Sequence, residues 1–436
     1  MKSERKDNSV ISTAGEIFSD GAIIELLRDV ANPENLKLVL SQEGALDLNP
    51  KVSHAGRAYE PMRLNRSVSK AVRLPTRVAA PETARKLFTA VHSLLSGHLG
   101  QLDTCITALV FAIFASWMSP VLPMAPLLWV FASAGSPTNL MLQLMSLLCR
   151  RPLRLVGLRR GDILRLPMSL RPTLLLEEPD LRPEMQMILQ SSTHRGTGII
   201  SSRGLLEFYG PKIICARKLA HGAALETDAL RVALIPVAGL LPPLDKRAEE
   251  QIAEEFQARF LGYFLRNCNN VQNPNFDVSQ FSLPVRDLAR ALGASIVGDH
   301  EVQKRILPLL NVQDEEIRAD LARTSDAVVL EAALSFIHKG GQPKVRSASI
   351  AEKAAAIYKG RGSDQQPPPE SVGKAIRRLG IPSGPIDRAG NGIELNVDTC
   401  RLIHKLALSH GVRAMQGGFH SNCRYCREFE TMIAKT

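Results

Sequence analysis

The sequence predicts an α/β protein whose central sheet is mostly parallel. Two observations carry this prediction. Short continuous apolar runs, which are typical of strands buried on both faces, alternate with segments of helical periodicity. The chain has 436 residues, of which 45% are hydrophobic and 22% are charged, and this is the balance of a globular protein. A chain of this length can form two or three domains, each with a core of its own.

Residues 1–80 are expected to form a small N-terminal α+β unit that is rich in strands. Apolar stretches at residues 22–27 and 36–40 have the length of strands, and Gly44, Asn49 and Gly56 mark turns after them. The first ten residues lack the apolar segment of a secretory signal. We therefore expect a cytoplasmic protein whose seven cysteines are reduced.

The second region, residues 81–270, is predicted to hold the sheet. Helices come first, at residues 81–100 and 104–118. The apolar run of the second is shorter than the roughly 20 residues of a membrane span and is followed by prolines, so we expect a buried helix and no membrane segment. Strands are expected at residues 127–131, 173–176, 212–216 and 232–237, and further helices at 140–148, 184–190 and 247–267. This alternation favours a parallel sheet covered on both faces.

The loop after the first of these strands occupies the place of a Walker A phosphate loop, Gly-x-x-x-x-Gly-Lys-[Ser/Thr]. An intact loop uses its glycines so that backbone N–H groups can approach phosphate, its lysine for the β and γ phosphates, and its hydroxyl for magnesium. All four diagnostic residues differ here, and the residues in their places are Ala132, Pro137, Thr138 and Asn139. Gly135 and Ser136 remain as small residues of the turn. The loop is therefore predicted to be a vestigial nucleotide site.

Paired acids follow the strand at residues 173–176, in the form of a Walker B element. In a working enzyme the first acid, here Glu177, would hold the metal, and the second, Glu178, would orient the attacking water. The alternative is that the two glutamates only end a buried strand at the solvent.

In order and spacing, these segments resemble the ATPase-like domain of unknown function in helicase-like proteins of phages, plasmids and other mobile elements, which is related to primase-associated helicases. The resemblance runs through the buried helix and three short segments, at residues 126–128, 171–175 and 209–212. Over nearly the whole chain, the sequence is also similar to degenerate relatives from soil acidobacteria. These share the lysine-free loop and the Cys-Arg-Arg-Pro segment at residues 149–152.

This resemblance implies a P-loop NTPase-like core and the residues that a working member would carry. Those are a lysine in the loop, an aspartate first in Walker B, and an arginine in a later loop, where this chain has Thr138, Glu177 and Asp228. We therefore expect a pseudoenzyme without a bound cofactor. Residual binding of ATP with magnesium, and an active helicase-like ATPase with a divergent loop, are the alternatives. The class also forms rings, so a homo-oligomer is a further alternative.

The chain is basic, with 54 Lys and Arg against 43 Asp and Glu and a formal charge of +11, which favours a polyanionic partner such as DNA. A strip of seven arginines with one acid, Asp162, is a candidate contact for the phosphate backbone. A solvated face of the core is the alternative. The strip consists of Arg150, Arg151, Arg154, Arg159, Arg160, Arg165 and Arg171.

Residues 271–340 are predicted to be mostly helical, and residues 341–415 have the pattern of a winged helix-turn-helix. A helix at 349–359 and a basic helix at 370–379 flank a polar turn, and Ala-Gly-Asn-Gly at 389–392 predicts a hairpin. In such a fold the second helix enters the major groove and the hairpin touches the backbone or minor groove. The expected DNA contacts are Lys374, Arg377, Arg378 and, on the wing, Arg388. A regulator that contacts only protein is the alternative.

Residues 416–436 form a tail that contains His420, Cys423 and Cys426 in His-x-x-Cys-x-x-Cys spacing. Cys-x-x-Cys supplies two ligands to zinc, and a closed site needs four. Residues near enough in sequence to supply another are Cys400, His404 and His410. Because there is no second Cys-x-x-Cys, a metal-free thiol tail is the alternative. The remaining cysteines are expected in the core, at Cys105, Cys149, Cys215 and Cys268.

Overall fold

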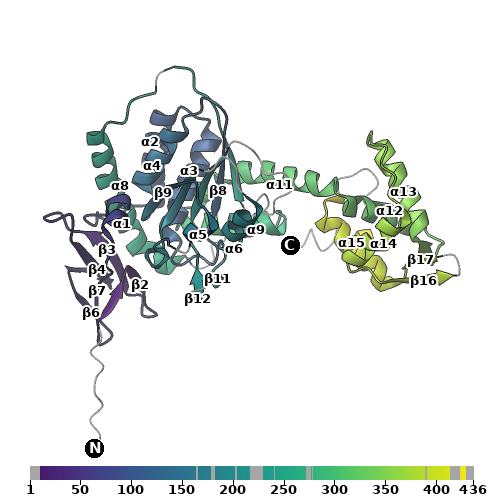
Figure 1. The fold of residues 1–436 in the computed structure, drawn as a ribbon, viewed down its shortest axis with the longest axis horizontal. Helices are drawn as coiled ribbons and strands as arrows, with labels where there is room; N and C mark the ends of the chain where they lie inside the picture. The colour runs from purple at the N-terminus through teal and green to yellow at the C-terminus, as the bar shows by residue number, and fades with distance from the viewer. Residues whose placement is uncertain are drawn as a thin grey trace, which may run out of the picture. The chain divides into compact units, whose positions relative to one another are not determined.

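The computed structural model divides the chain into two compact units, described separately here and drawn in Figure 1. The first comprises Met1–Val278 and Leu283–Leu310, and the second comprises Ser279–Ser282 and Asn311–Thr436. The residues that the structure describes are 10–163, 165–177, 182–201, 204–216, 229–239, 241–271, 276, 278–387, 390–412 and 423–428.

The first unit begins with two small sheets and a short helix. Antiparallel strands form one sheet in the order β2-β3-β4-β5, and the other has the order β1-β7-β6, with β1 parallel to β7. The elements are β1 (Ile11–Thr13), β2 (Gly15–Ile17), β3 (Ile23–Arg28), β4 (Leu36–Gln42), β5 (Ala45–Asn49), β6 (Val52–His54), β7 (Arg57–Pro61) and α1 (Arg66–Ala71). A shared core contains Leu26, Leu38 and Tyr59. The predicted β-rich character of this segment is confirmed.

A five-stranded parallel sheet forms the centre of the first unit, in the order β14-β8-β13-β10-β9. Its strands are β8 (Leu127–Ala132), β9 (Pro152–Val156), β10 (Thr173–Glu177), β13 (Lys212–Ala216) and β14 (Ala229–Leu234). All five residues of β13 are buried, and this central strand pairs with β8 on one side and β10 on the other. The predicted α/β class with a parallel sheet is confirmed.

Helices surround this sheet, as Figure 1 shows. They are α2 (Ala84–Leu99), α3 (Asp103–Met118), α4 (Thr138–Leu148), α5 (Arg160–Ile163), α6 (Pro183–Ser191), α8 (Lys246–Asn267), α9 (Leu283–Ser295) and α10 (His300–Lys304). Helix α3 is buried at every position from Cys105 to Met118, which confirms the core helix that the sequence predicts. Its Trp117 stacks on Phe260 of α8 and donates a hydrogen bond to the Leu148 carbonyl. Across the part of the chain that the structure describes, no helix has the length and apolar character needed to cross a bilayer.

Between residues 81 and 270, three of the described strands are absent from the sequence expectation. They are β9 and the antiparallel pair β11 (Gly198–Ser201) and β12 (Gly204–Glu207). Strand β9 lies at the edge of the sheet, and Arg154 interrupts its apolar residues Leu153 and Leu155, so no continuous apolar run marks it. Strand β14 also begins and ends three residues earlier than predicted.

The second unit consists of helices around a three-stranded antiparallel sheet, β15-β17-β16. Helix α11 (Leu307–Ala322) crosses the boundary between the units, and the other elements are α12 (Ser325–Lys339), β15 (Lys344–Arg346), α13 (Ser347–Gly360), α14 (Pro369–Arg378), β16 (Ser383–Asp387), β17 (Gly390–Glu394) and α15 (Val397–Ser409). Ile350, Ile376 and Ile403 share one core, in which α14 packs on α13, and both α13 and α15 pack on α12. The two helices and the hairpin that the sequence predicts here are confirmed.

Candidate functional site

The phosphate-loop position lies where strand β8 ends and helix α4 begins. Ala132 is the last residue of the strand, and Thr138 is the first of the helix. Gly135 has a φ of 85°, a left-handed conformation that glycine adopts without strain. Strand β10, separated from β8 by β13, places Glu177 at the same edge of the sheet. In open α/β sheets ligands bind beyond this carboxyl edge, so the arrangement fits a P-loop-like core.

Within the loop, donors that would face a phosphate are hydrogen-bonded to the protein instead. The backbone N–H of Ser136 donates to the Ser133 carbonyl at 3.1 Å, and that of Thr138 donates to the Ser136 carbonyl at 2.8 Å. The Ser136 hydroxyl donates to the Leu234 carbonyl of β14 at 2.5 Å. Pro137 has no N–H to offer. The loop is therefore closed on itself and on the neighbouring strand.

A guanidinium lies where an intact site would bind magnesium. The Nη2 atom of Arg154 donates to Oδ1 of Asn139 at 2.7 Å and to Oε2 of Glu177 at 3.2 Å. These two residues stand in the positions of the metal-binding hydroxyl and of the first Walker B acid. Arg154 therefore places a fixed positive charge between the two groups that would otherwise share a metal ion. With the lysine also absent, the described residues do not fit a magnesium–ATP complex.

The contacts of Arg154 at this site were not predicted, because the sequence grouped this residue with the arginine strip. The available signal was the alternation of Leu153, Arg154 and Leu155, which is typical of an edge strand. Glu178 and Asp228, the other predicted residues of this site, lie outside the described residues.

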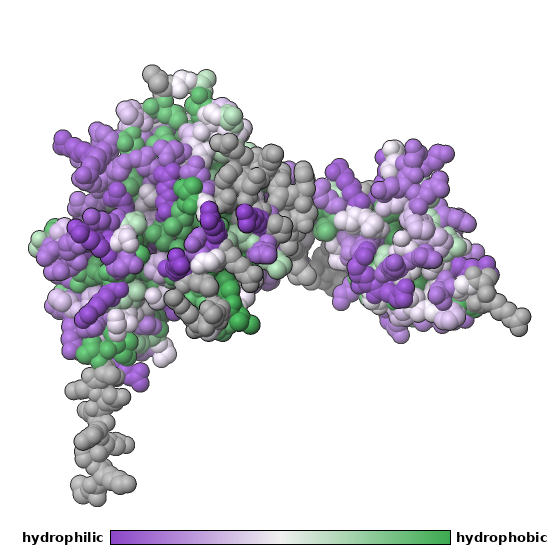
Figure 2. Space-filling model, in the orientation of Figure 1, coloured by the Kyte–Doolittle hydropathy of each residue, from purple (hydrophilic) through white to green (hydrophobic). Residues whose placement is uncertain are grey.

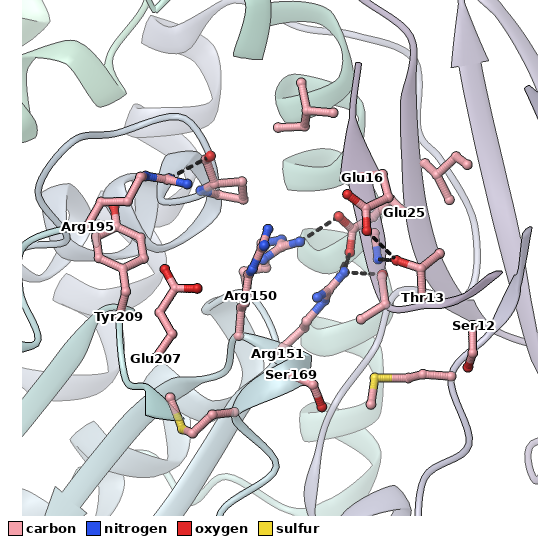
Figure 3. Close-up of a pocket in the computed structure, with 18 of the residues that line it drawn as sticks. Ser12, Thr13, Glu16, Glu25, Arg150, Arg151, Ser169, Arg195, Glu207 and Tyr209 are labelled. Carbon is pink, nitrogen blue, oxygen red and sulfur yellow. Dashed lines mark hydrogen bonds and ion pairs between the residues drawn. The ribbon is translucent and has the colours of Figure 1, made fainter. Parts of the chain in front are cut away.

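Two arginines of that strip are buried, which contradicts their proposed contact with DNA. Arg150 and Arg151 are 3% and 1% exposed. Arg150 Nη2 donates to Oε2 of Glu25 at 2.7 Å, and Arg151 Nε donates to Oε1 of the same carboxylate at 3.0 Å. Figure 3 shows both side chains converging on Glu25, which belongs to strand β3. The prediction was wrong for this pair, because a cluster of arginines in the sequence does not show which of their side chains point into the core.

In this cluster, burial and ion pairing shift the pKa of Glu25 in opposite directions. Burial raises the pKa of Glu25, but attraction to Arg150 and Arg151 outweighs it, and the net result is a pKa below the ordinary value. Arg151 also donates to the Leu170 carbonyl at 2.7 Å, and Arg150 lies over the Phe264 ring with its Cζ 5.6 Å from the centroid. The cluster joins the N-terminal sheets to the core of the same unit.

A polar cavity of about 580 Å³ adjoins this cluster. Arg195, drawn in Figure 3, lines it but points its guanidinium at backbone carbonyls, with Nη2 3.0 Å from Ser119 O and 2.7 Å from Pro120 O. It also stacks over Tyr209 at 4.7 Å. Three of the arginines that line this cavity, Arg150, Arg151 and Arg195, thus donate hydrogen bonds to acceptors within the protein. Of the remaining strip, Arg159, Arg165 and Arg171 are exposed, and the side chain of Arg160 is outside the described residues.

Helix α14 turns its basic residues to solvent. Lys374 and Arg377 are exposed, whereas Val372 and Ile376 on the opposite face are buried. Arg378 is also exposed but pairs with Asp326 of α12, with Nε 3.1 Å from Oδ2. The hydrogen bond to Asp326 raises the pKa of Arg378, so this guanidinium is held against its own unit. Arg388 lies outside the described residues. Figure 2 shows that the visible surface of this unit is predominantly hydrophilic.

The cysteines of the tail meet two histidines. Cys423 and Cys426 lie with His338 of α12 and His404 of α15, and the four potential ligand atoms are within 4.8 Å of one another. The sequence pointed to both cysteines and counted His404 among the nearby candidates, but it offered no signal for His338, which is 88 residues before Cys426. His410 is not part of this group. His420 lies outside the described residues.

Comparisons with known proteins complete the description. No family model matches the chain, and no curated protein matches it. Among solved structures, the apo C-terminal region of NrS-1 is 10% identical, with 86% of this chain and 97% of that chain covered and a TM-score of 0.37. Drosophila ORC bound to DNA is 14% identical, with 80% and 96% covered and a TM-score of 0.19. Cdc6p from Pyrobaculum aerophilum is 12% identical, with 70% and 91% covered and a TM-score of 0.20. Because these scores are low, we base the P-loop-like assignment on the sheet and its loop.

Proposed function

We propose that this protein is a DNA-associated member of the helicase-like class of mobile elements, with an ATPase-like core that does not hydrolyse ATP and a winged helix that binds DNA. One observation carries the DNA-binding half of the proposal. Helix α14 packs one face into the core of its unit and presents Lys374 and Arg377 on the other. A basic, exposed second helix is the element that such folds insert into the major groove.

The surroundings of α14 support the winged-helix assignment. Helices α13 and α14 share a core, and the β16–β17 hairpin follows α14 directly. Gly392 in this hairpin is a tight position, since a Cβ there would lie 2.1 Å from the Val345 carbonyl oxygen and 2.4 Å from Ile386 Cδ1. The hairpin therefore packs closely against β15, as a rigid wing requires.

The bridging contact of Arg154 supports loss of hydrolysis. Hydrolysis requires a metal ion to neutralise the charge that develops on the phosphates, and an acid to orient the attacking water. Here Asn139 and Glu177 already share a guanidinium. Because Arg154 carries its charge permanently, it competes with magnesium at any physiological pH.

DNA binding is tested with the full chain and a labelled duplex at two salt concentrations. Replacing Lys374 and Arg377 with alanine should weaken binding at least tenfold and reduce the salt slope by about 2, one for each lost phosphate contact. The matched control replaces Lys246 and Arg290, which are exposed in the first unit, and should keep wild-type affinity. Equal affinity of the α14 variant and the control would remove α14 from the interface.

ATP turnover is measured on the same protein with and without DNA. We expect the rate of the full chain to equal that of a buffer blank, because the loop lacks lysine and donates its own N–H groups internally. Turnover that rises with DNA and disappears in Glu178→Gln would sink the pseudoenzyme proposal and favour an active helicase-like ATPase.

A second candidate function, contact with protein, is favoured by the β11–β12 hairpin. Ile200 and Leu205 are opposite each other in its register and are 85% and 76% exposed. Figure 2 shows hydrophobic residues at the surface around this hairpin. A self-associating chain should become more monomeric in light scattering when both residues are changed to lysine. A wild type that is already monomeric at all concentrations would exclude self-association through this hairpin.

A further inference from the structure

The second unit gathers four potential metal ligands from three separate parts of the chain. His338 lies near the end of α12, His404 lies in α15, and Cys423 and Cys426 belong to the last described segment. His404 and Cys426 are buried, and the other two are half-buried. Among the described residues, this is the one group of three or more histidines, cysteines and acids whose ligand atoms come together this closely.

Three of the six distances between the ligand atoms are close to the edges of a zinc tetrahedron, and all six are within 4.8 Å. With Zn–N near 2.0 Å and Zn–S near 2.3 Å, such a tetrahedron has edges of about 3.3 Å between two nitrogens and about 3.5 Å between nitrogen and sulfur. The two Nε2 atoms of His338 and His404 are 3.3 Å apart. Cys423 Sγ is 3.5 Å from Nε2 of His404, and Cys426 Sγ is 3.3 Å from Nε2 of His338.

The hydrogen bond on the other side of His404 fixes which nitrogen faces the group. Nδ1 of His404 is 2.7 Å from the Cys400 carbonyl oxygen, which can only accept a hydrogen bond. Nδ1 therefore carries the proton, and in the neutral ring Nε2 presents a lone pair. That lone pair faces the Nε2 of His338 and the sulfur of Cys423. Metal-bound histidines use the same second hydrogen bond to set their tautomer and orientation.

We propose that His338, His404, Cys423 and Cys426 form a closed structural zinc site. Two thiolates and two imidazoles suit zinc and exclude the hard, oxygen-binding cations magnesium and calcium. The two thiolate charges balance the charge of the ion, so the buried site is neutral as a whole. Because all four positions are filled by protein, the site leaves none open for water or substrate, and its role is to hold structure.

The ion would attach the C-terminal segment to the helices behind the proposed winged helix. Other contacts already orient this segment. The Tyr425 ring lies 5.4 Å from that of His404, and Arg401 Nε of α15 lies 3.1 Å from Glu428 Oε2. Zinc would therefore lock α12 and α15, which share the core with α14, and so stabilise the DNA-facing helix from behind. The site stands on its own ligands and does not depend on DNA binding.

The test begins with the full chain, purified without a metal-affinity tag, and its metal content measured by elemental mass spectrometry. We expect about one zinc per chain in the wild type. X-ray absorption at the zinc edge should show two nitrogen and two sulfur neighbours, near 2.0 Å and 2.3 Å. A wild type with less than about a tenth of an equivalent of zinc, or a zinc shell with four oxygen or nitrogen neighbours, would overturn the proposal.

Two histidine variants separate this ligand set from the one that sequence spacing suggests. His338→Ala should lose at least tenfold in zinc affinity, whereas His420→Ala should keep the wild-type zinc content and spectrum. His410→Ala, a histidine at the end of the same helix α15, is the matched control and should also keep zinc. The opposite pattern, with zinc lost in His420→Ala and kept in His338→Ala, would assign the metal to the tail alone. If His338→Ala does not fold, His420→Ala still decides between the two ligand sets, because it keeps its zinc only if His420 is not a ligand.

Discussion

Three arginines of the first unit and two basic residues of helix α14 in the second unit differ in what their charges contact. In the first unit, arginine side chains are directed at internal acceptors: Arg154 bridges Asn139 and Glu177, and Arg150 and Arg151 share Glu25. In the second, helix α14 presents Lys374 and Arg377 to solvent. The net charge of +11 therefore does not say where an anionic partner binds. Burial and pairing decide that, because a guanidinium already paired inside the protein has little left to offer a phosphate.

Cation sites show the same contrast. At the phosphate-loop edge the protein's own guanidinium lies between two groups that could hold a metal. In the second unit, four imidazole and thiol ligand atoms lie within 4.8 Å of one another. The predictions below test each side of this comparison.

Removal of metal should have the largest effect on stability. This effect should be confined to the second unit. Chelation of the full chain is expected to destabilise α12 and α15 by about 5 kcal/mol or more, because structural zinc commonly contributes about 10 kcal/mol or more in small domains. Hydrogen exchange should then speed up in these helices while β8 and β13 stay protected. Equal loss of protection in both units would mean that the metal also stabilises the first unit. Unchanged exchange rates would mean that metal does not stabilise the second unit.

Glu25→Gln should be the most damaging single change in the first unit. It leaves two buried guanidinium groups without their carboxylate, which typically costs about 3–5 kcal/mol. Because the pKa of Glu25 is lowered in the fold, its contribution is present above the ordinary value of 4.5 and is lost as pH falls through the lower folded pKa. Chemical unfolding at pH 7 measures the loss. Glu16→Gln serves as the control and should change stability by less than about 1 kcal/mol, because Glu16 lies beside the same cavity and accepts a hydrogen bond from the Thr13 hydroxyl. A comparable loss in both variants would refute the special role of the buried carboxylate.

Lys212 should make the stability of the first unit depend on alkaline pH. The Nζ group of this buried residue donates to the carbonyls of Ser192 and Gly210, and burial lowers its pKa from 10.5 to about 7. Between these two pKa values the unfolded chain binds the proton more tightly, so stability should rise with pH, by up to about 5 kcal/mol. Lys212→Met should flatten the rise between pH 7 and pH 9.5 in chemical unfolding. An unchanged slope in this variant, with the exposed Lys246→Met as reference, would assign the pH dependence to other groups.

Arg154→Ala should have the smallest effect on stability and still be informative about function. The Arg154–Glu177 pair is partly exposed, so its removal should change the unfolding free energy by less than about 1 kcal/mol. If the guanidinium stands in for the metal, magnesium–ATP should stabilise the variant at least as much as the wild type in thermal unfolding. Stronger stabilisation of the wild type would show instead that Arg154 helps to bind nucleotide.

Local patterns allowed much of the architecture to be predicted. Continuous apolar runs predicted β8, β10, β13 and the buried helix α3, and helical periodicity predicted α2, α13 and α14, because these elements bury surfaces that leave a trace in residue order. Edge strand β9 and the β11–β12 hairpin were missed because each has few buried residues, and a short strand with one packed neighbour imposes little on its sequence. The last strand was displaced by three residues for a different reason, because its apolar run continues past Leu234.

The sequence singled out the loop after β8, the acid at the end of β10, the basic helix and the two tail cysteines, because each of these is written in adjacent residues. It could not show that Arg154 reaches Asn139 and Glu177, that Glu25 neutralises Arg150 and Arg151, or that His338 joins Cys426 across 88 residues. These contacts join parts of the chain that only folding brings together. Pairing of charges and ligands depends on distances of a few ångströms in space, and separation along the chain carries no information about them.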